Sequence, residues 1–287
     1  MEPREAIGTV GIIGAGTMGA GIAQVFLGAG YPVCLHDQDA ERSEFAVEKI
    51  RAGLERWEAK GKLASAAGTL ERLEACADLA PLHGCDLVVE AIVEDPGAKE
   101  DLLRALGRLC KPETILASNT SSNSITRLGA ATGRPERTLG LHFFNPAPVM
   151  RLVEVVSGLR TDPEVLSLAE RLVRTLEKTP VRSADRPGFL SNRILMPLLN
   201  EAFHVLEEGV GTAEDIDRTF KLGMGHPMGP LELADLIGLD VCLAILQVLH
   251  GELGDPRFHP APILKKYVEA GWLGRKNGRG FFEYPAA

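Results

Sequence analysis

Short apolar runs alternate with amphipathic segments through the first two thirds of the chain. Runs at residues 9–13, 32–36, 86–92 and 115–118 predict strands buried on both faces, because such strands are apolar at nearly every position. The segments between them carry apolar residues at helical spacing, most regularly in residues 39–60. This alternation predicts an α/β domain with a mostly parallel sheet.

Residues 139–156 predict an antiparallel hairpin around a proline-rich turn centred on Pro148. A symmetric register pairs residues whose numbers sum to 296, which places His142 opposite Glu154. Residues that face each other across such a pair lie about 5 Å apart at Cβ, on one face of the sheet. The register therefore predicts a histidine beside a carboxylate within an apolar ribbon.

A carboxylate in this position can fix one imidazole tautomer and stabilise the charged ring, as a general base requires. An isolated histidine on an apolar strand is more often a structural core residue. A carboxylate beside it does not prove catalysis, because purely structural ion pairs perturb histidines in the same way. The pair by itself leaves both interpretations open.

The pattern changes near residue 185. Asp185-Arg-Pro-Gly188 groups breakers, and from there to the end the apolar spacing is helical without alternating strands. We expect two domains, residues 1–185 and 186–287, of which the second is all-α.

Composition supports a globular protein of about two domains, with 287 residues, 45% of them hydrophobic and 24% charged. The net charge of −8 argues against nucleic-acid binding. The five cysteines lack C-x-x-C spacing and the seven histidines lack ligand spacing, so we expect a reducing compartment and no metal site.

Residues 6–35 carry no charge and are long enough to span a bilayer. Eight of these thirty residues are glycine, and a glycine-rich turn interrupts the segment. A buried strand–loop–helix explains it better. We expect a soluble cytoplasmic protein that does not bind membranes.

That glycine-rich turn is Gly14-Ala-Gly-Thr-Met-Gly19, which follows the first predicted strand and opens a predicted helix. Asp37 ends the second strand, 18 residues beyond Gly19. This order is typical of a dinucleotide-binding Rossmann unit, with the pyrophosphate at the helix N-terminus and the acid on the ribose hydroxyls. Asp37 would repel a 2′-phosphate and is followed by Gln38 instead of an arginine, so the sequence favours NAD over NADP.

Further motifs accompany this loop: Val89-Glu-Ala-Ile-Val-Glu94, Ser118-Asn-Thr-Ser-Ser122, His142-Phe-Phe-Asn-Pro146, Pro187-Gly-Phe-Leu-Ser-Asn-Arg193 and Gly278-Arg-Gly-Phe-Phe282. With them the chain resembles the L-3-hydroxyacyl-CoA dehydrogenases, and among these the bacterial 3-hydroxybutyryl-CoA dehydrogenases, from about residue 8 to Tyr284. The resemblance implies NAD-dependent oxidation of an (S)-3-hydroxyacyl-CoA, expected to be short-chain, to the 3-ketoacyl-CoA. It also implies a role in fatty acid β-oxidation or butanoate metabolism, and a homodimer formed through the helical, substrate-binding domain.

By this resemblance His142 is the general base and Glu154 orients it, while Ser121 and Asn192 hydrogen-bond the substrate oxygen. The residues implied to hold NAD are Gly14, Ala15, Gly16, Thr17, Met18, Gly19, Asp37, Glu94, Lys99, Asn119, Asn145 and Lys276. One departure is Asn123, where the family usually has an aliphatic residue. Two alternatives remain: a dehydrogenase of a free hydroxy or sugar acid, and a non-catalytic NAD-binding structural protein.

Overall fold

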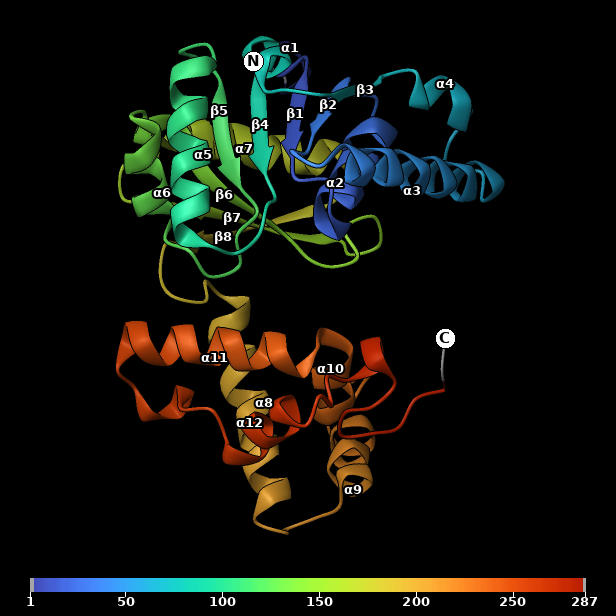
Figure 1. The fold of residues 1–287 in the computed structure, drawn as a ribbon, viewed down its shortest axis with the longest axis vertical. Helices are drawn as coiled ribbons and strands as arrows, with labels where there is room; N and C mark the ends of the chain where they lie inside the picture. Colours follow the sequence, from blue (N-terminus) through green and yellow to red (C-terminus); the bar gives the residue numbers. More distant parts are fainter. Residues whose placement is uncertain (1–2, 286–287) are drawn as a thin grey trace. The chain divides into compact units, whose positions relative to one another are not determined.

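A computed structural model describes residues 3–285, with only the backbone described for Arg4 and Glu5. The chain divides into two compact units, Met1–Arg186 and Pro187–Ala287 (Figure 1). The predicted boundary, between residues 185 and 186, lies one residue earlier.

The first unit is built on an eight-stranded sheet with the order β3-β2-β1-β4-β5-β6-β7-β8. Strands β1 to β6 are parallel, β7 is antiparallel to β6, and β8 is parallel to β7. The strands are β1 Val10–Ile13, β2 Val33–His36, β3 Leu73–Cys76, β4 Leu87–Glu90, β5 Ile115–Ser118, β6 Thr138–Phe143, β7 Leu152–Ser157 and β8 Thr179–Ala184. The predicted α/β class with a mostly parallel, Rossmann-type sheet is confirmed.

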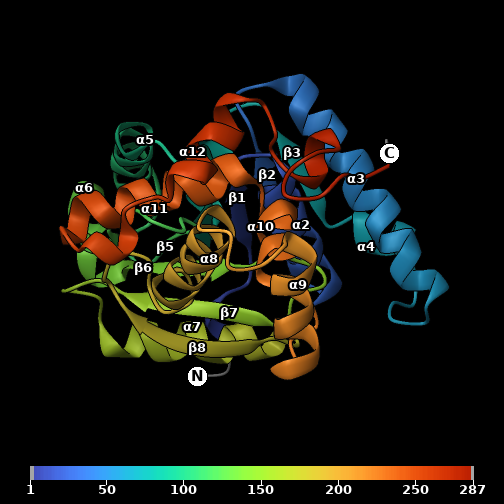
Figure 2. The same ribbon diagram turned by 90° about the horizontal axis from the view of Figure 1, so that it is seen from below.

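Helices cover both faces of this sheet. They are α1 Pro3–Ala6, α2 Thr17–Gly28, α3 Ala40–Ala59, α4 Ala66–Leu70, α5 Pro96–Leu109, α6 Ile125–Thr132 and α7 Pro163–Thr175, with short 3₁₀ turns η1 Ala80–Gly84 and η2 Pro135–Arg137. One core joins α2, α3 and α7 to alternate strand residues such as Val10, Leu35 and Val89. Helices α5 and α6 lie together on the other face (Figures 1 and 2). Both faces of the central strands are thereby buried, which explains their apolar sequences.

The hairpin has the predicted register. His142 pairs with Glu154 and Leu139 with Ser157 across β6 and β7, so facing numbers sum to 296. The connecting residues 144–151 contain a cis peptide bond between Asn145 and Pro146. Side chains of His142 and Glu154 therefore lie on one face, opposite the face of Leu141 and Val155 in the core.

Several elements of the first unit were not predicted, among them α1, α4, β3 and α6. Strand β3 is only four residues long and carries the exposed Glu74, so it lacks an apolar run; its pairing with β2 defines it. Helix α6 begins beside Asp185, whose carboxylate accepts from the Ser124 hydroxyl at 2.8 Å and from the Thr126 N–H at 2.7 Å. Helix α6 also carries local signals that the sequence-based prediction missed: the Ser124 hydroxyl oxygen accepts from the Arg127 N–H at 3.2 Å as an N-cap, and Gly133 is left-handed at the C-cap.

The second unit is helical, as predicted. Its elements are α8 Ser191–Glu207, α9 Ala213–Arg218, the π-helical turn η3 Thr219–Gly223, α10 Pro230–Ile237, α11 Leu239–Leu253, η4 Pro256–Phe258, α12 Pro262–Glu269 and η5 Arg275–Asn277. Its own core includes Phe203, Leu246 and Phe258. Among the described residues no single helix is long and apolar enough to cross a membrane; only the bent pair α10 and α11, at 95°, reaches that length and composition together.

Candidate active site

The three glycines of the first loop have different surroundings. Gly14 has φ +98°, and a Cβ there would lie 2.5 Å from the Ala91 carbonyl oxygen. A Cβ on Gly19 would lie 1.7 Å from the Gly14 carbonyl oxygen, whereas one on Gly16 would meet nothing within 4 Å. Gly14 and Gly19 are thus required by the fold, and Gly16 leaves open space at the N-terminus of α2.

This space belongs to a cavity of about 670 Å³, lined among others by Gly14, Gly16, Thr17, Met18 and Asp37. The Gly16 N-cap supplies no side chain, and the first turn of α2 carries no acid. The N–H groups of that turn therefore favour an anion. The site suits the pyrophosphate of a dinucleotide.

Asp37 is held in place by the backbone. The Ala15 N–H donates to one carboxylate oxygen at 2.7 Å, and the Asp39 N–H donates to the other at 3.0 Å. The carboxylate keeps lone pairs that can accept from ribose hydroxyls. Arg42 lines the same cavity and pairs with Asp39 at 3.3 Å. The sequence analysis considered only the residue after Asp37 and missed this arginine.

A buried ion pair lies where β4 ends. The Lys99 ammonium is 2.6 Å from Glu90 Oε1, and both side chains are at most 1% exposed. Ser118 donates to Glu90 Oε2 at 2.6 Å and the Ile92 N–H to Oε1 at 2.7 Å. These bonds satisfy the carboxylate, as a buried charge requires. Sequence reasoning missed Glu90, although a carboxylate ending an apolar strand was a visible signal.

Lys99, predicted as a cofactor contact, is thus engaged inside the protein, and it also lies 3.3 Å from Glu94 Oε2. Glu94 further accepts from the Ser121 N–H at 2.6 Å and from the Thr120 hydroxyl at 2.9 Å. Burial by itself would raise the pKa of Glu94, but Lys99 and these donors outweigh it and hold the pKa below its usual value. Glu94 is therefore a fixed anion next to the loop that carries Ser121.

The His142 ring is bonded to its carboxylate partner. Nδ1 lies 2.7 Å from Glu154 Oε2, with side chains 10% and 1% exposed. The Phe144 ring lies 4.7 Å from the imidazole, centroid to centroid. Asn119 steadies the same end of β6, because its Oδ1 accepts from the Phe143 N–H at 2.9 Å. An imidazole held at Nδ1 by a carboxylate presents Nε2 as its basic atom.

Three predicted site residues lie outside the clusters described so far. Asn145 is exposed in the hairpin loop. Asn192, in the first turn of α8, and Lys276, whose ammonium lies 2.5 Å from the Asp240 carboxylate, belong to the second unit. Their roles stay predictions.

Comparison with known proteins covers nearly the whole chain. Residues 9–186 match the NAD-binding domain of 3-hydroxyacyl-CoA dehydrogenase, and residues 188–284 match the C-terminal domain of the same family. The chain is 52% identical to a probable 3-hydroxybutyryl-CoA dehydrogenase of Deinococcus radiodurans (96% of this chain, 99% of the relative). It is 50% identical to a 3-hydroxybutyryl-CoA dehydrogenase of Bradyrhizobium diazoefficiens (97% and 96%).

Solved structures agree. The crystal structure of (S)-3-hydroxybutyryl-CoA dehydrogenase from Ralstonia eutropha is 44% identical, with a TM-score of 0.94 over 98% of this chain and 100% of that one. The glycine loop, the anchored Asp37 and both matched domains agree with one assignment. The chain belongs to the 3-hydroxyacyl-CoA dehydrogenase family and is an NAD-dependent oxidoreductase.

Proposed function

We propose that this protein oxidises (S)-3-hydroxyacyl-CoA thioesters of short chain, 3-hydroxybutyryl-CoA first among them, to the 3-ketoacyl-CoA. The observation that carries the proposal is the buried His142–Glu154 pair in the same unit as a dinucleotide cavity. The similar proteins from Deinococcus, Bradyrhizobium and Ralstonia are named 3-hydroxybutyryl-CoA dehydrogenases, which supports a short acyl chain in the substrate. The reaction belongs to fatty acid β-oxidation or butanoate metabolism.

His142 acts as the general base. With Nδ1–H donated to Glu154, Nε2 accepts the proton of the substrate's 3-hydroxyl group. The ring becomes an imidazolium, which the Glu154 carboxylate stabilises at 2.7 Å. NAD, when bound, supplies the acceptor for the hydride that leaves C3.

The other assigned residues bind and orient. Asp37 accepts from the adenine ribose, and the first turn of α2 binds the pyrophosphate. Five further residues are assigned to cofactor binding: Glu94, Lys99, Asn119, Asn145 and Lys276. Lys99 acts indirectly, because its ammonium holds the Glu94 carboxylate in place. Ser121 and Asn192 hydrogen-bond the substrate oxygen; the Ser121 hydroxyl donates to Glu94 at 3.0 Å and would exchange that bond for one to substrate.

Replacing the base tests the mechanism. His142→Ala should lower kcat for 3-hydroxybutyryl-CoA by about 10²–10⁴-fold while leaving the Kd for NAD unchanged, because the ring acts on the proton and not on the cofactor. Glu154→Gln should lower kcat less and shift the pH profile. The exposed His83→Ala is the control. If the kcat of His142→Ala stayed within a few fold of the wild-type value, His142 would not be the general base.

Substrate class is tested separately, by measuring NADH formation with 3-hydroxyacyl-CoAs of graded length and with free 3-hydroxybutyrate. We expect kcat/KM to be highest for a short-chain thioester. Higher activity on the free acid would favour the hydroxy-acid alternative.

We also propose a homodimer in the cytoplasm, formed through the second unit. That unit exposes large apolar side chains, among them Ile194, Val210, Leu222 and Met224, each at least 59% exposed. An interface with a second copy would remove such apolar side chains from water. Light scattering should give twice the 30.8 kDa chain mass, and Leu222→Glu should shift it towards the monomer. A wild-type monomer would refute this proposal.

A further inference from the structure

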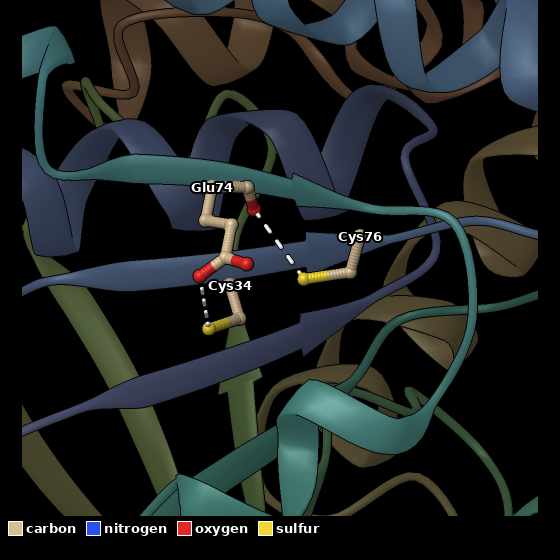
Figure 3. A group of neighbouring side chains, drawn as sticks. All are labelled: Cys34, Glu74 and Cys76. Carbon is tan, nitrogen blue, oxygen red and sulfur yellow. Dashed lines mark hydrogen bonds between the residues drawn. The ribbon is translucent and has the colours of Figure 1, made fainter.

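Two cysteines and a glutamate meet at the β3 edge of the sheet (Figure 3). The sulfurs of Cys34 and Cys76 and a carboxylate oxygen of Glu74 all lie within 4.8 Å of one another. The Cys34 sulfur is 3.9 Å from Glu74 Oε2. Figure 3 shows the three side chains on the same side of the two strands.

Strand register brings these residues together. Cys34 pairs with Glu74 and His36 pairs with Cys76 in the parallel β2–β3 ladder. Residues two apart on a strand point to one face, so Cys34, Glu74 and Cys76 share a face. Cys34 lies on the predicted strand β2, but Cys76 lies far from it in the sequence, on strand β3, which was not predicted. The absence of C-x-x-C spacing therefore led us to expect no metal site.

The geometry points to a binding site for a soft divalent cation: we propose that Cys34, Cys76 and Glu74 bind Zn²⁺ or Cd²⁺. Thiolates with a carboxylate are a donor set that Zn²⁺ accepts, and Zn–S distances of about 2.3 Å put tetrahedral ligand atoms roughly 3.7 Å apart. The present separations exceed this by about 1 Å at most, which side-chain rotation can close. Three protein ligands leave a fourth position for water.

Burial fits this donor set. Cys34 and Cys76 are 7% and 5% exposed, whereas Glu74 is exposed. The two sulfurs are thus shielded from bulk solvent, and the carboxylate side gives an entry path. A site closed on all sides could not exchange its ion, and a fully exposed carboxylate–thiol group would bind weakly.

A third thiol favours the charged form of Cys34. A hydrogen bond from Cys85 lowers the pKa of Cys34 to about 7 against the effect of burial. Cys85 reaches this position because Gly11 has no side chain: a Cβ on Gly11 would lie 3.3 Å from the Cys85 sulfur. Burial raises the pKa of Cys76 to about 12, so a metal ion must displace this proton and binding should strengthen as pH rises.

The site adjoins the cofactor cavity through the backbone. His36 and Asp37, which follow Cys34, line that cavity, and His36 Nδ1 lies 3.0 Å from the Cys76 carbonyl oxygen. A bound ion would therefore add a second link between β3 and β2, the strand that Asp37 follows. The proposed metal site does not rest on the proposed acyl-CoA substrate.

The test uses the full chain, reduced with a phosphine and freed of metal. Cd²⁺ titration should produce thiolate-to-metal charge-transfer absorption that saturates at one ion per chain, and Zn²⁺ should raise the Tm. Cys34→Ser and Cys76→Ser should each weaken Zn²⁺ binding at least about 100-fold, since even outer-shell changes cost 10–100-fold. Glu74→Gln, an exposed change that leaves the core intact, should weaken it about 10-fold.

Cys242→Ala is the matched control, because Cys242 is also buried but lies in the second unit. It should bind Zn²⁺ as wild type does. NAD binding by each variant checks that the protein is folded. The proposal fails if wild type gives no charge-transfer band, if the band survives in Cys34→Ser or Cys76→Ser, or if Glu74→Gln leaves affinity unchanged.

Discussion

Glu94 illustrates how one side chain is fixed by several weak partners. Its carboxylate accepts from Ser121 and Thr120, and it lies 3.3 Å from the Lys99 ammonium. Asn123, the position that the resemblance marked as a departure, donates its amide to Glu94 Oε2 at 2.9 Å. Asn123 therefore adds a donor to this cluster.

The charge of Glu94 should make the stability of the wild-type chain depend on pH. Its pKa is lower in the folded chain than the usual value of about 4.3, so the carboxylate stabilises the fold above that pH, and the stabilisation is lost as pH falls through the folded pKa. Glu94→Gln should have a lower free energy of unfolding than wild type at pH 7. Urea unfolding should show that difference shrinking below about pH 4.

The exposed Glu113→Gln provides the comparison, since it removes the same charge away from any such cluster. A Glu94→Gln deficit that stays constant from neutral to acidic pH would rule out the ionic explanation.

At the level of elements, the six residues of the β1–α2 turn include glycines that the fold requires and one glycine that leaves space for a ligand. Gly19 packs against the Gly14 carbonyl, but Gly16 has φ −68° and an open neighbourhood. Alanine can adopt the Gly16 conformation, so its methyl group changes only the space beside the helix N-terminus.

The two alanine variants should therefore fail in different ways. Gly19→Ala should lower the free energy of unfolding by at least about 1–3 kcal/mol, because backbone must move. Gly16→Ala should keep the wild-type Tm and weaken NAD binding. Thermal unfolding and NAD titration measure the two effects; a stable Gly19→Ala or a Gly16→Ala with wild-type NAD affinity would contradict the assignment.

Charge is unevenly distributed over the whole molecule. The chain has a net charge of −8, yet a cavity of about 930 Å³ in the first unit is lined by Lys62, Arg151, Arg174 and Lys178, with Glu177 as its acid. Lys178 is tied to the hairpin loop, donating to the Ala147 and Met150 carbonyls. Local cations of this kind attract a polyanion despite the overall charge.

We expect this cavity to bind the phosphates of coenzyme A. Lys62→Glu should raise KM for the acyl-CoA roughly 10-fold at low salt, with less effect at high salt, because exposed charges are screened. The KM for NAD should not change. Lys266→Glu on α12, which makes the same charge change in the second unit, is the control. Equal effects of both variants would attribute the change to net charge alone.

Local sequence determined the elements that carry their own pattern. The apolar strands, the glycine loop with Asp37 and the 296-sum register of β6 and β7 are all set by residues close together in the chain, where periodicity and turn chemistry act. Strand β3 and the contact of Asp185 with α6 have no such pattern, and although Glu90 ends an apolar strand, nothing local pairs it with Lys99.

Only tertiary structure decided these: β3 and Asp185 have partners in distant segments, and the Glu90–Lys99 pair, although nine residues apart, depends on burial. In the sequence Glu90 is the polar end of a strand, and Lys99 was assigned to the cofactor; because both side chains are buried, each charge needs the other. Cys34 and Cys76 are ordinary small hydrophobic residues until β2 and β3 pair. The sequence by itself determined the family, the cofactor loop and the His142–Glu154 pair, while the folded sheet decided which other polar side chains meet.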